Sequence, residues 1–162
     1  MNKALFLILV VLVSACAVNK GTKTIHPYNG GSVGCGNFIV YKLTDDNTEY
    51  VSVVLDASSI ELEQTQAYAI GIADVVKVTR KKYAGSIASS LCNDVMADKP
   101  EELLEEIASE GIVEVRVSEV EIKKAEKKEA YKATIILKNV VFDGVVIDYL
   151  RLEDVTVGWL PG

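Results

Sequence analysis

The sequence predicts an all-β domain, an antiparallel β-sandwich of about seven or eight strands with an immunoglobulin-like or related Greek-key arrangement. Short segments in which apolar and polar residues alternate recur from Cys35 to the C-terminus. Turn-forming clusters of Gly, Asn and Asp separate these segments. Such alternation is typical of antiparallel sheets that bury one face, and two such sheets bury those faces against each other.

The first strands are expected between residues 37 and 83. Residues 37–43 are rich in aromatic and β-branched side chains, and the polar cluster at 44–48 follows them. Residues 50–55 alternate again and predict the returning strand of a hairpin. Residues 76–79 predict a further strand that leads into a basic run.

One short helix is expected at residues 101–110. Asp98 is a suitable N-cap, Pro100 suits the first turn, and Gly111 suits the C-cap. The apolar stripe of this helix would consist of Leu103, Leu104 and Ile107. Residues 84–96 combine helical spacing with many Gly, Ser and Asn residues, so their structure stays open.

The last fifty residues predict three more strands at 112–122, 131–140 and 145–152. A charged turn separates the first two strands, and Asp143-Gly144 separates the last two. A further apolar segment ends at Trp159.

The N-terminus has the three parts of an export signal. A basic start with Lys3 precedes an apolar run of about ten residues, which is shorter than the roughly 20 residues that span a bilayer. The next residues, Val13-Ser14-Ala15-Cys16, resemble the lipobox of bacterial lipoproteins. The resemblance implies a signal peptide at 1–15 and lipid on Cys16, and the alternative is an ordinary secretory signal that contains a cysteine.

Lipid on Cys16 predicts a protein anchored to a membrane without spanning it. Ala17 does not resemble an inner-membrane retention signal, which favours the outer membrane. Residues 16–34 contain several glycines and no apolar periodicity, so they predict a flexible tether. The remaining residues, 35–162, are then one domain of suitable size.

Cys35 and Cys92 remain after lipidation, and an even pair in an exported protein favours a disulfide. The bond would close a long loop and stabilise the domain by about 4 kcal/mol. Two separate buried thiols are the alternative, because the sequence does not give their distance.

The charge and the chemistry of the chain exclude several functions. The net charge is −6, and it becomes −7 when residues 1–15 with Lys3 are removed, which disfavours nucleic acid as a partner. The single histidine, His26, lies in the predicted tether, so histidine-based catalysis and zinc binding lack their residues in the domain. We expect no cofactor and no metal. The acidic turn at 45–49 could offer ligands to calcium, but Asp and Asn are also common turn residues.

The best candidate for a contact surface is the basic run Arg80, Lys81, Lys82 and Tyr83, on a chain that is otherwise acidic. A solvated strand end explains the same run. The tyrosines and Trp159 could form platforms for a glycan, although most alternate in phase with aliphatic core residues.

The segment from Tyr131 through Asn139-Val140-Val141-Phe142 to Val157-Gly158-Trp159-Leu160-Pro161-Gly162, together with Cys35 and Cys92, resembles a group of small uncharacterised β-rich lipoproteins of Gram-negative bacteria. The resemblance covers roughly residues 35–162 and implies no activity.

Three hypotheses of function follow. The first is a lipid-anchored, non-enzymatic domain of the cell envelope that binds or supports another component, such as an envelope protein. The second is a glycan-binding module, which requires a coplanar pair of exposed aromatic side chains. The third is a glycan-active enzyme, which requires two carboxylates about 5–9.5 Å apart in a cleft.

Overall fold

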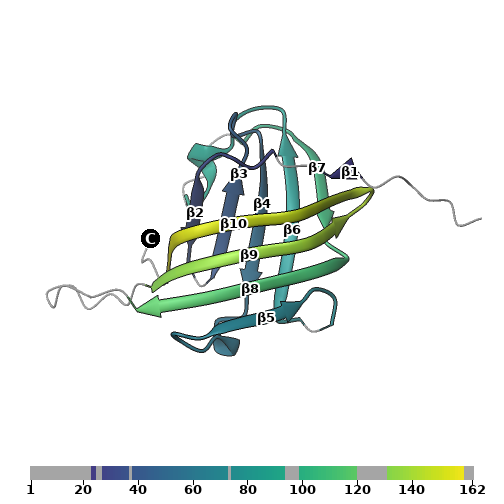
Figure 1. Ribbon diagram of the computed structural model, residues 1–162. Helices are drawn as coiled ribbons and strands as arrows, with labels where there is room; N and C mark the ends of the chain where they lie inside the picture. The colour runs from purple at the N-terminus through teal and green to yellow at the C-terminus, as the bar shows by residue number, and fades with distance from the viewer. Residues whose placement is uncertain are drawn as a thin grey trace, which may run out of the picture.

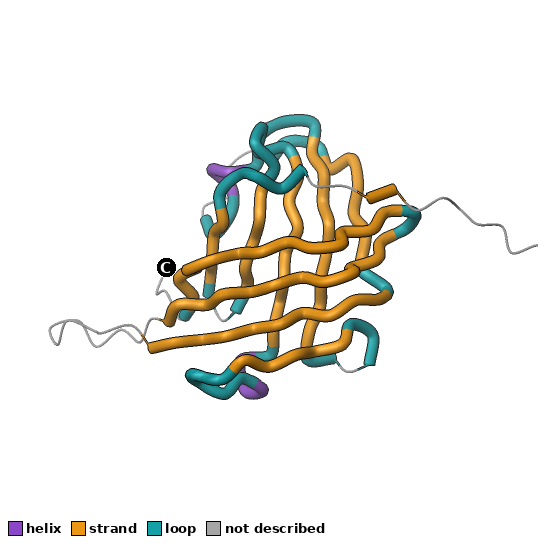
Figure 2. Tube along the Cα trace, viewed as in Figure 1, coloured by secondary structure: helices purple, strands orange, loops and turns teal. Residues whose placement is uncertain are grey.

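The computed structural model confirms the predicted antiparallel β-sandwich, and its described residues form ten strands in place of about seven or eight (Figures 1 and 2). It describes residues 23–24, 27–36, 38–72, 74–93, 99–119 and 131–158. Residues 1–22, which include the predicted signal peptide and Cys16, lie outside the described residues, as do His26 and Trp159.

Sheet I has the strand order β1-β10-β9-β8-β5. All its pairs are antiparallel except the short parallel pair of β1 with β10. Its strands are β1 (Lys23–Thr24), β5 (Thr65–Ala69), β8 (Glu110–Glu119), β9 (Tyr131–Phe142) and β10 (Val145–Val157). The predicted strands of the C-terminal third are thus confirmed within the described residues, and the apolar segment toward Trp159 continues β10.

Sheet II has the order β2-β3-β4-β6-β7, and all its pairs are antiparallel. Its strands are β2 (Ser32–Cys35), β3 (Ile39–Leu43), β4 (Glu49–Leu55), β6 (Val76–Tyr83) and β7 (Glu102–Ile107). The predicted hairpin is β3–β4, with the turn where the polar cluster predicts it. Two short 3₁₀ turns, η1 (Ala57–Ser59) and η2 (Ala88–Ser90), are the helical elements of the described residues.

The strands of the two sheets cross at a steep angle (Figure 1). This orthogonal packing differs from the nearly aligned sheets of an immunoglobulin domain. At one corner the chain passes from β7 to β8 through Ala108 and Ser109, whose N–H groups donate to Val78 in sheet II and to Val141 in sheet I, both at 2.9 Å. At another corner the N–H of Gly158, which follows β10, donates to the carbonyl of Gly36, which follows β2, at 3.1 Å.

The core between the sheets consists mainly of β-branched aliphatic side chains, because every second residue of each strand points inward. In sheet II these residues include Val40, Val51, Val53 and Val78, all fully buried. In sheet I they include Val113, Ala133, Ile135 and Leu137. A core of such branched side chains explains why alternation gave a correct prediction of these strands.

The predicted helix at 101–110 is wrong. The segment forms β7 and the start of β8, and Gly111, the predicted C-cap, lies inside β8 with φ of +134°. A helix of about ten residues has little stability of its own. In β7 the same residues instead pair with β6, for example Glu105 opposite Lys81, and Leu104 opposite Lys82.

The predicted tether at 16–34 is also wrong for its described part. Tyr28 has an exposed fraction of 3% and belongs to the main core, although glycines and a proline surround it. Gly30 and Gly31 exchange backbone hydrogen bonds with Leu43, and β2 starts at Ser32. The buried ring of Tyr28 and these backbone hydrogen bonds therefore hold the glycine-rich segment on the domain.

The sequence leaves the structure of residues 84–96 open. The described part, residues 84–93, is mostly irregular and covers the outer face of sheet II, and we call it the cover segment. Its Ile87 packs with Leu43, Tyr50 and Tyr83 in a second, smaller apolar cluster. The predicted disulfide joins Cys92 at the end of this cover segment to Cys35 in β2. The disulfide thereby holds residues 84–93 against sheet II.

Candidate binding surfaces and the buried charge network

The predicted basic run lies in β6, where alternation sends its side chains to opposite faces of sheet II. Arg80 follows Val76 and Val78 on the inner face, and 13% of its side chain is exposed. Lys81 lies on the outer face, and Lys82 is exposed. Tyr83 ends the strand and is buried. The four residues therefore do not form one basic surface.

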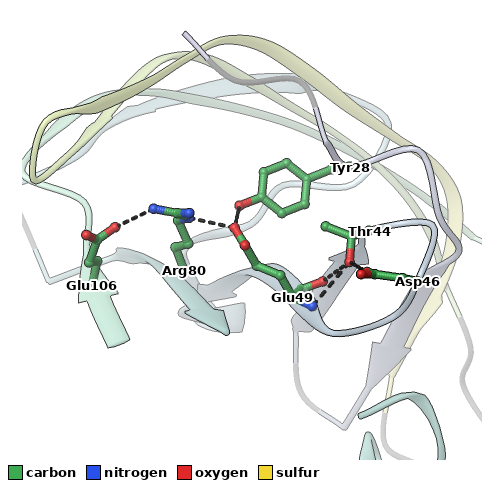
Figure 3. A network of polar contacts seen from close by, with 6 residues as sticks. All are labelled: Tyr28, Thr44, Asp46, Glu49, Arg80 and Glu106. Atoms are coloured by element: carbon green, nitrogen blue, oxygen red, sulfur yellow. Dashed lines mark hydrogen bonds and ion pairs between the residues drawn. The ribbon is translucent and has the colours of Figure 1, made fainter. Parts of the chain in front are cut away.

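Arg80 is the centre of a charge network at the inner side of sheet II (Figure 3). Its Nε donates to Glu49 Oε1 at 2.6 Å, and its Nη1 donates to Glu106 Oε2 at 2.9 Å. The hydroxyl of Tyr28 donates to the same Oε1 of Glu49, also at 2.6 Å. Three strands, β4, β6 and β7, and the segment before β2 thus meet at one guanidinium.

Burial and hydrogen bonding fix the protonation states in this network. Burial raises the pKa of the Tyr28 hydroxyl, and the hydrogen bond to Glu49 raises it further. Burial opposes the charge of Arg80, but its hydrogen bond to Glu49 and the nearby negative charge outweigh that effect and raise its pKa. The network therefore stays as a neutral phenol and a charged guanidinium.

Carboxylates from β7 also form ion pairs with Lys81, the residue of the basic run that lies on the outer face of sheet II. The Nζ of Lys81 lies 2.9 Å from both Glu102 Oε2 and Glu105 Oε2. The hydroxyl of Tyr83 donates to Glu102 Oε2 at 3.2 Å. These acids are about twenty residues away in the sequence, in the segment predicted as a helix, so their neutralisation of Lys81 could not be predicted from the sequence.

The tyrosines in the described residues pack mainly against the protein. Tyr41 and Tyr50 meet edge to face with ring centroids 5.0 Å apart, and Tyr50 lies beside Tyr83 under the cover segment. Tyr149 is the one tyrosine of the described residues whose side chain is largely exposed, at 48%. The described part of the chain therefore lacks the coplanar exposed pair that a glycan platform needs.

The most buried of the described carboxylates make structural contacts. Glu49 and Glu106 both bind Arg80, so the most buried pair of acids is compensated by a cation. In the turn before β4, Asp46 accepts from the Thr44 hydroxyl at 2.6 Å and from the Thr48 N–H at 3.1 Å. No group of three or more His, Cys, Asp or Glu side chains within the described ranges could hold a metal ion.

An apolar groove of about 630 Å³ lies where β4, β6 and β7 meet the residues Ile70, Gly71, Ile72 and Asp74 after β5. Three of its lining residues are large exposed hydrophobics, with Val54 37%, Ile107 57% and Ile72 81% exposed. Asp74 and Lys77 are its charged lining residues. The sequence does not indicate this groove, because helical spacing places Ile107 in the apolar stripe of the predicted helix.

Comparisons with protein-family models, with curated proteins and with solved structures found no match for this chain. Within the residues that the structure describes, no helix has the length and apolar character needed to cross a membrane. The arguments on function therefore rest on the sequence and on the geometry above.

Proposed function

We propose that this chain is a lipid-anchored protein of the cell envelope, and that its β-sandwich domain binds another envelope protein without catalysis. The basic start, the short apolar run and the lipobox-like residues before Cys16 support export and lipidation. The disulfide between Cys35 and Cys92 supports an oxidising compartment.

The groove at Ile107 is the observation that carries the binding role. Scattered exposed hydrophobic residues are common, but a group of them around one hollow marks an interaction surface. Val54, Ile72 and Ile107 form such a group. Their burial by a partner would remove apolar area from water, which is the main driving force of protein association.

The neighbouring strand β7 indicates what kind of partner fits. It is the last strand of sheet II, so in the described residues one of its edges has no paired strand. A free edge accepts an extended segment through backbone hydrogen bonds. We therefore propose an extended segment of a partner protein that adds to β7 and places apolar side chains in the groove.

The charge of β7 defines the partner further. Glu101, Glu102, Glu105 and Glu106 lie on or next to this strand, and Lys81 and Arg80 compensate only part of their charge. A second copy of the strand would bring like charges together, which is unfavourable. The partner segment is therefore basic as well as apolar.

Site-specific photo-crosslinking tests the groove. A photoreactive residue replaces Ile107 in the native envelope, and the matched control replaces Ile112, which is also exposed but lies on sheet I. We expect one discrete crosslink at position 107 and none at 112, with a cross-linked peptide that is basic and apolar. A synthetic peptide with the cross-linked sequence should bind the native protein, and its affinity for the I107D variant should be at least tenfold lower. Equal crosslinking at both positions, or a peptide that I107D binds equally well, would contradict the proposal.

Intact-mass analysis tests the anchor. The native product should lack residues 1–15 and carry fatty acid on Cys16, and the C16S variant should carry none. An unmodified thiol at Cys16 in the native product would overturn the lipid-anchor part of the proposal.

A further inference from the structure

A second hollow, of about 330 Å³, lies between the two sheets at the edge of β10. β1 pairs with β10 at Val145 and Val146 and then ends, and the hollow starts at Ile147, the next residue of β10. Lys42 from β3 and Asn29 from the segment before β2 line the side that faces β10. Residues of both sheets therefore contribute to this hollow.

Lys42 is the unusual residue of the hollow. It shares the inner face of β3 with Val40, so the strand directs its side chain toward the space between the sheets. Its ammonium donates to the carbonyl of Gly30 at 2.8 Å and has no ion pair with any described carboxylate. An ammonium has three N–H donors, so further acceptors can bind it.

Arg80 is a second cation on the inner face of sheet II, and its partners can be compared with those of Lys42. Its guanidinium has two carboxylate partners, Glu49 and Glu106, both supplied by neighbouring strands. Lys42 has a carbonyl in place of such a partner. A half-buried cation without a counter-charge is unfavourable, and an anion that enters the hollow would remove that cost.

Arg151 brings a second cation to the same hollow from β10. Its Nε lies 2.6 Å from Glu153 Oε1, and about half of its side chain is exposed. Glu153 is the one ion-pair partner of Arg151 among the described residues. A guanidinium has five N–H donors in a planar fork, so it can also bind oxygen atoms of a phosphate or carboxylate.

The other lining residues set the kind of molecule that fits. Tyr149 and the amide of Asn29 provide an exposed aromatic ring and hydrogen-bonding groups, and Ile147 and Leu150 provide apolar surface. The volume is near the lower end of ligand pockets, which run from about 300 to 1,000 Å³. The ligand is therefore small and has both an anionic end and a carbon body.

We propose that the hollow between Lys42 and Arg151 binds the phosphate or carboxylate group of a small organic anion. The chain as a whole is acidic and repels anions, but two cationic residues are among the lining residues of this hollow. A soluble metabolite and a phospholipid headgroup both offer this chemistry.

NMR titration of the mature protein in a neutral detergent tests the site. Glycerol 3-phosphate and succinate are the probes, and glycerol is the uncharged control. We expect saturable shifts of the backbone amides at 29, 42 and 149–151 with at least one charged probe and none with glycerol. Equal shifts with glycerol, or shifts spread over the whole surface, would overturn the proposal.

Substitutions separate the site from general charge effects. K42M and R151Q should each weaken binding at least tenfold, and the exposed position of Arg151 keeps R151Q informative if K42M is unstable. K99M is the matched control because Lys99 is exposed and lines neither hollow, and its affinity should change less than twofold. Equal weakening by K99M would show a general charge effect and overturn the site.

Nanodiscs identify the source of the anion. Competition with glycerol 3-phosphate by phosphatidylglycerol nanodiscs, but not by phosphatidylcholine nanodiscs, would support the site with a lipid headgroup as its ligand. Absence of competition would support it with a soluble ligand. The site shares no lining residue with the groove at Ile107, so either proposal can fail without the other.

Discussion

The hydroxyl of Tyr28 donates a hydrogen bond to the Glu49 carboxylate at 2.6 Å, and this bond fixes the segment before β2 to the inner side of sheet II. The phenol is 3% exposed, and the carboxylate that it binds also compensates Arg80. This contact makes a glycine-rich segment part of the folded domain and joins it to the charge network.

Removal of this hydroxyl should destabilise the domain. We expect Y28F to lower the free energy of unfolding by about 1.5–3 kcal/mol, because a hydrogen bond to a charged acceptor is lost. Urea unfolding measures the change. Y149F is the matched control, because Tyr149 is exposed, and it should change stability by less than about 0.5 kcal/mol. Equal effects of the two variants would contradict the role of Tyr28.

Arg80 should be essential while its carboxylates are present. R80M leaves Glu49 and Glu106 without a counter-charge, and we expect a loss of about 3–5 kcal/mol. The control R116M breaks an exposed pair with Glu63 and should cost about 0–1 kcal/mol. The quadruple variant Y28F/E49L/R80M/E106L should recover most of the loss, because neither a charge nor an unpaired hydroxyl stays buried. A quadruple variant as unstable as R80M would argue against this explanation.

Gly34 should tolerate no side chain. A Cβ at this position in β2 would collide with the backbone carbonyl of Thr156 in β10, and backbone cannot move aside as a flexible side chain can. We expect G34A to lower stability by about 2–3 kcal/mol in thermal or urea unfolding. G31A is the control, because a Cβ at Gly31 meets no atom within 4 Å, and its stability should stay close to that of the native chain.

The disulfide should make a large contribution to stability. It joins residues 57 positions apart, and a loop of this length corresponds to about 4 kcal/mol in the chain-entropy model. Reductant should lower the unfolding midpoint of the native chain and leave that of C35A/C92A unchanged. If reductant has no effect on the native chain, the disulfide does not stabilise the cover segment.

Asp46 should contribute to stability in a pH-dependent way. Hydrogen bonds from the Thr44 hydroxyl, and then from the backbone and hydroxyl of Thr48, lower its pKa below the ordinary value of 3.8. A lowered folded-state pKa gives stability that is complete above the unfolded value and is lost as the pH falls through the folded value. The gap in urea midpoint between the native chain and D46N should therefore close in acid below pH 3.8. A gap that widens in acid would contradict this sign, and D45N in the same turn is the control.

The sequence predicted the parts of the fold that depend on local alternation. The hairpin of β3 and β4 and the three long strands β8, β9 and β10 alternate apolar and polar residues, and the structure confirms them. Prediction from the sequence failed where pairing with a distant strand determines the secondary structure. β7 has helical spacing in Leu103, Leu104 and Ile107, but its pairing with β6 makes it a strand.

The same reason limits the prediction of sites. The run from Arg80 to Tyr83 was visible in the sequence, but its neutralisation depends on Glu49 from β4 and on Glu102 and Glu106 from β7. The hollow at Lys42 was invisible, because Arg151 comes from the other sheet and from the opposite end of the chain.

The pairing of Lys23 with Val145 limits how far the domain can stand from a lipid anchor. Six residues lie between Cys16 and Lys23, and an extended chain over these seven Cα–Cα steps reaches at most about 25 Å. If Cys16 carries lipid as proposed, the hairpin at Asp143 and Gly144 is confined to a thin layer above the bilayer. A partner must then come within that layer, which would select proteins that are themselves close to the membrane.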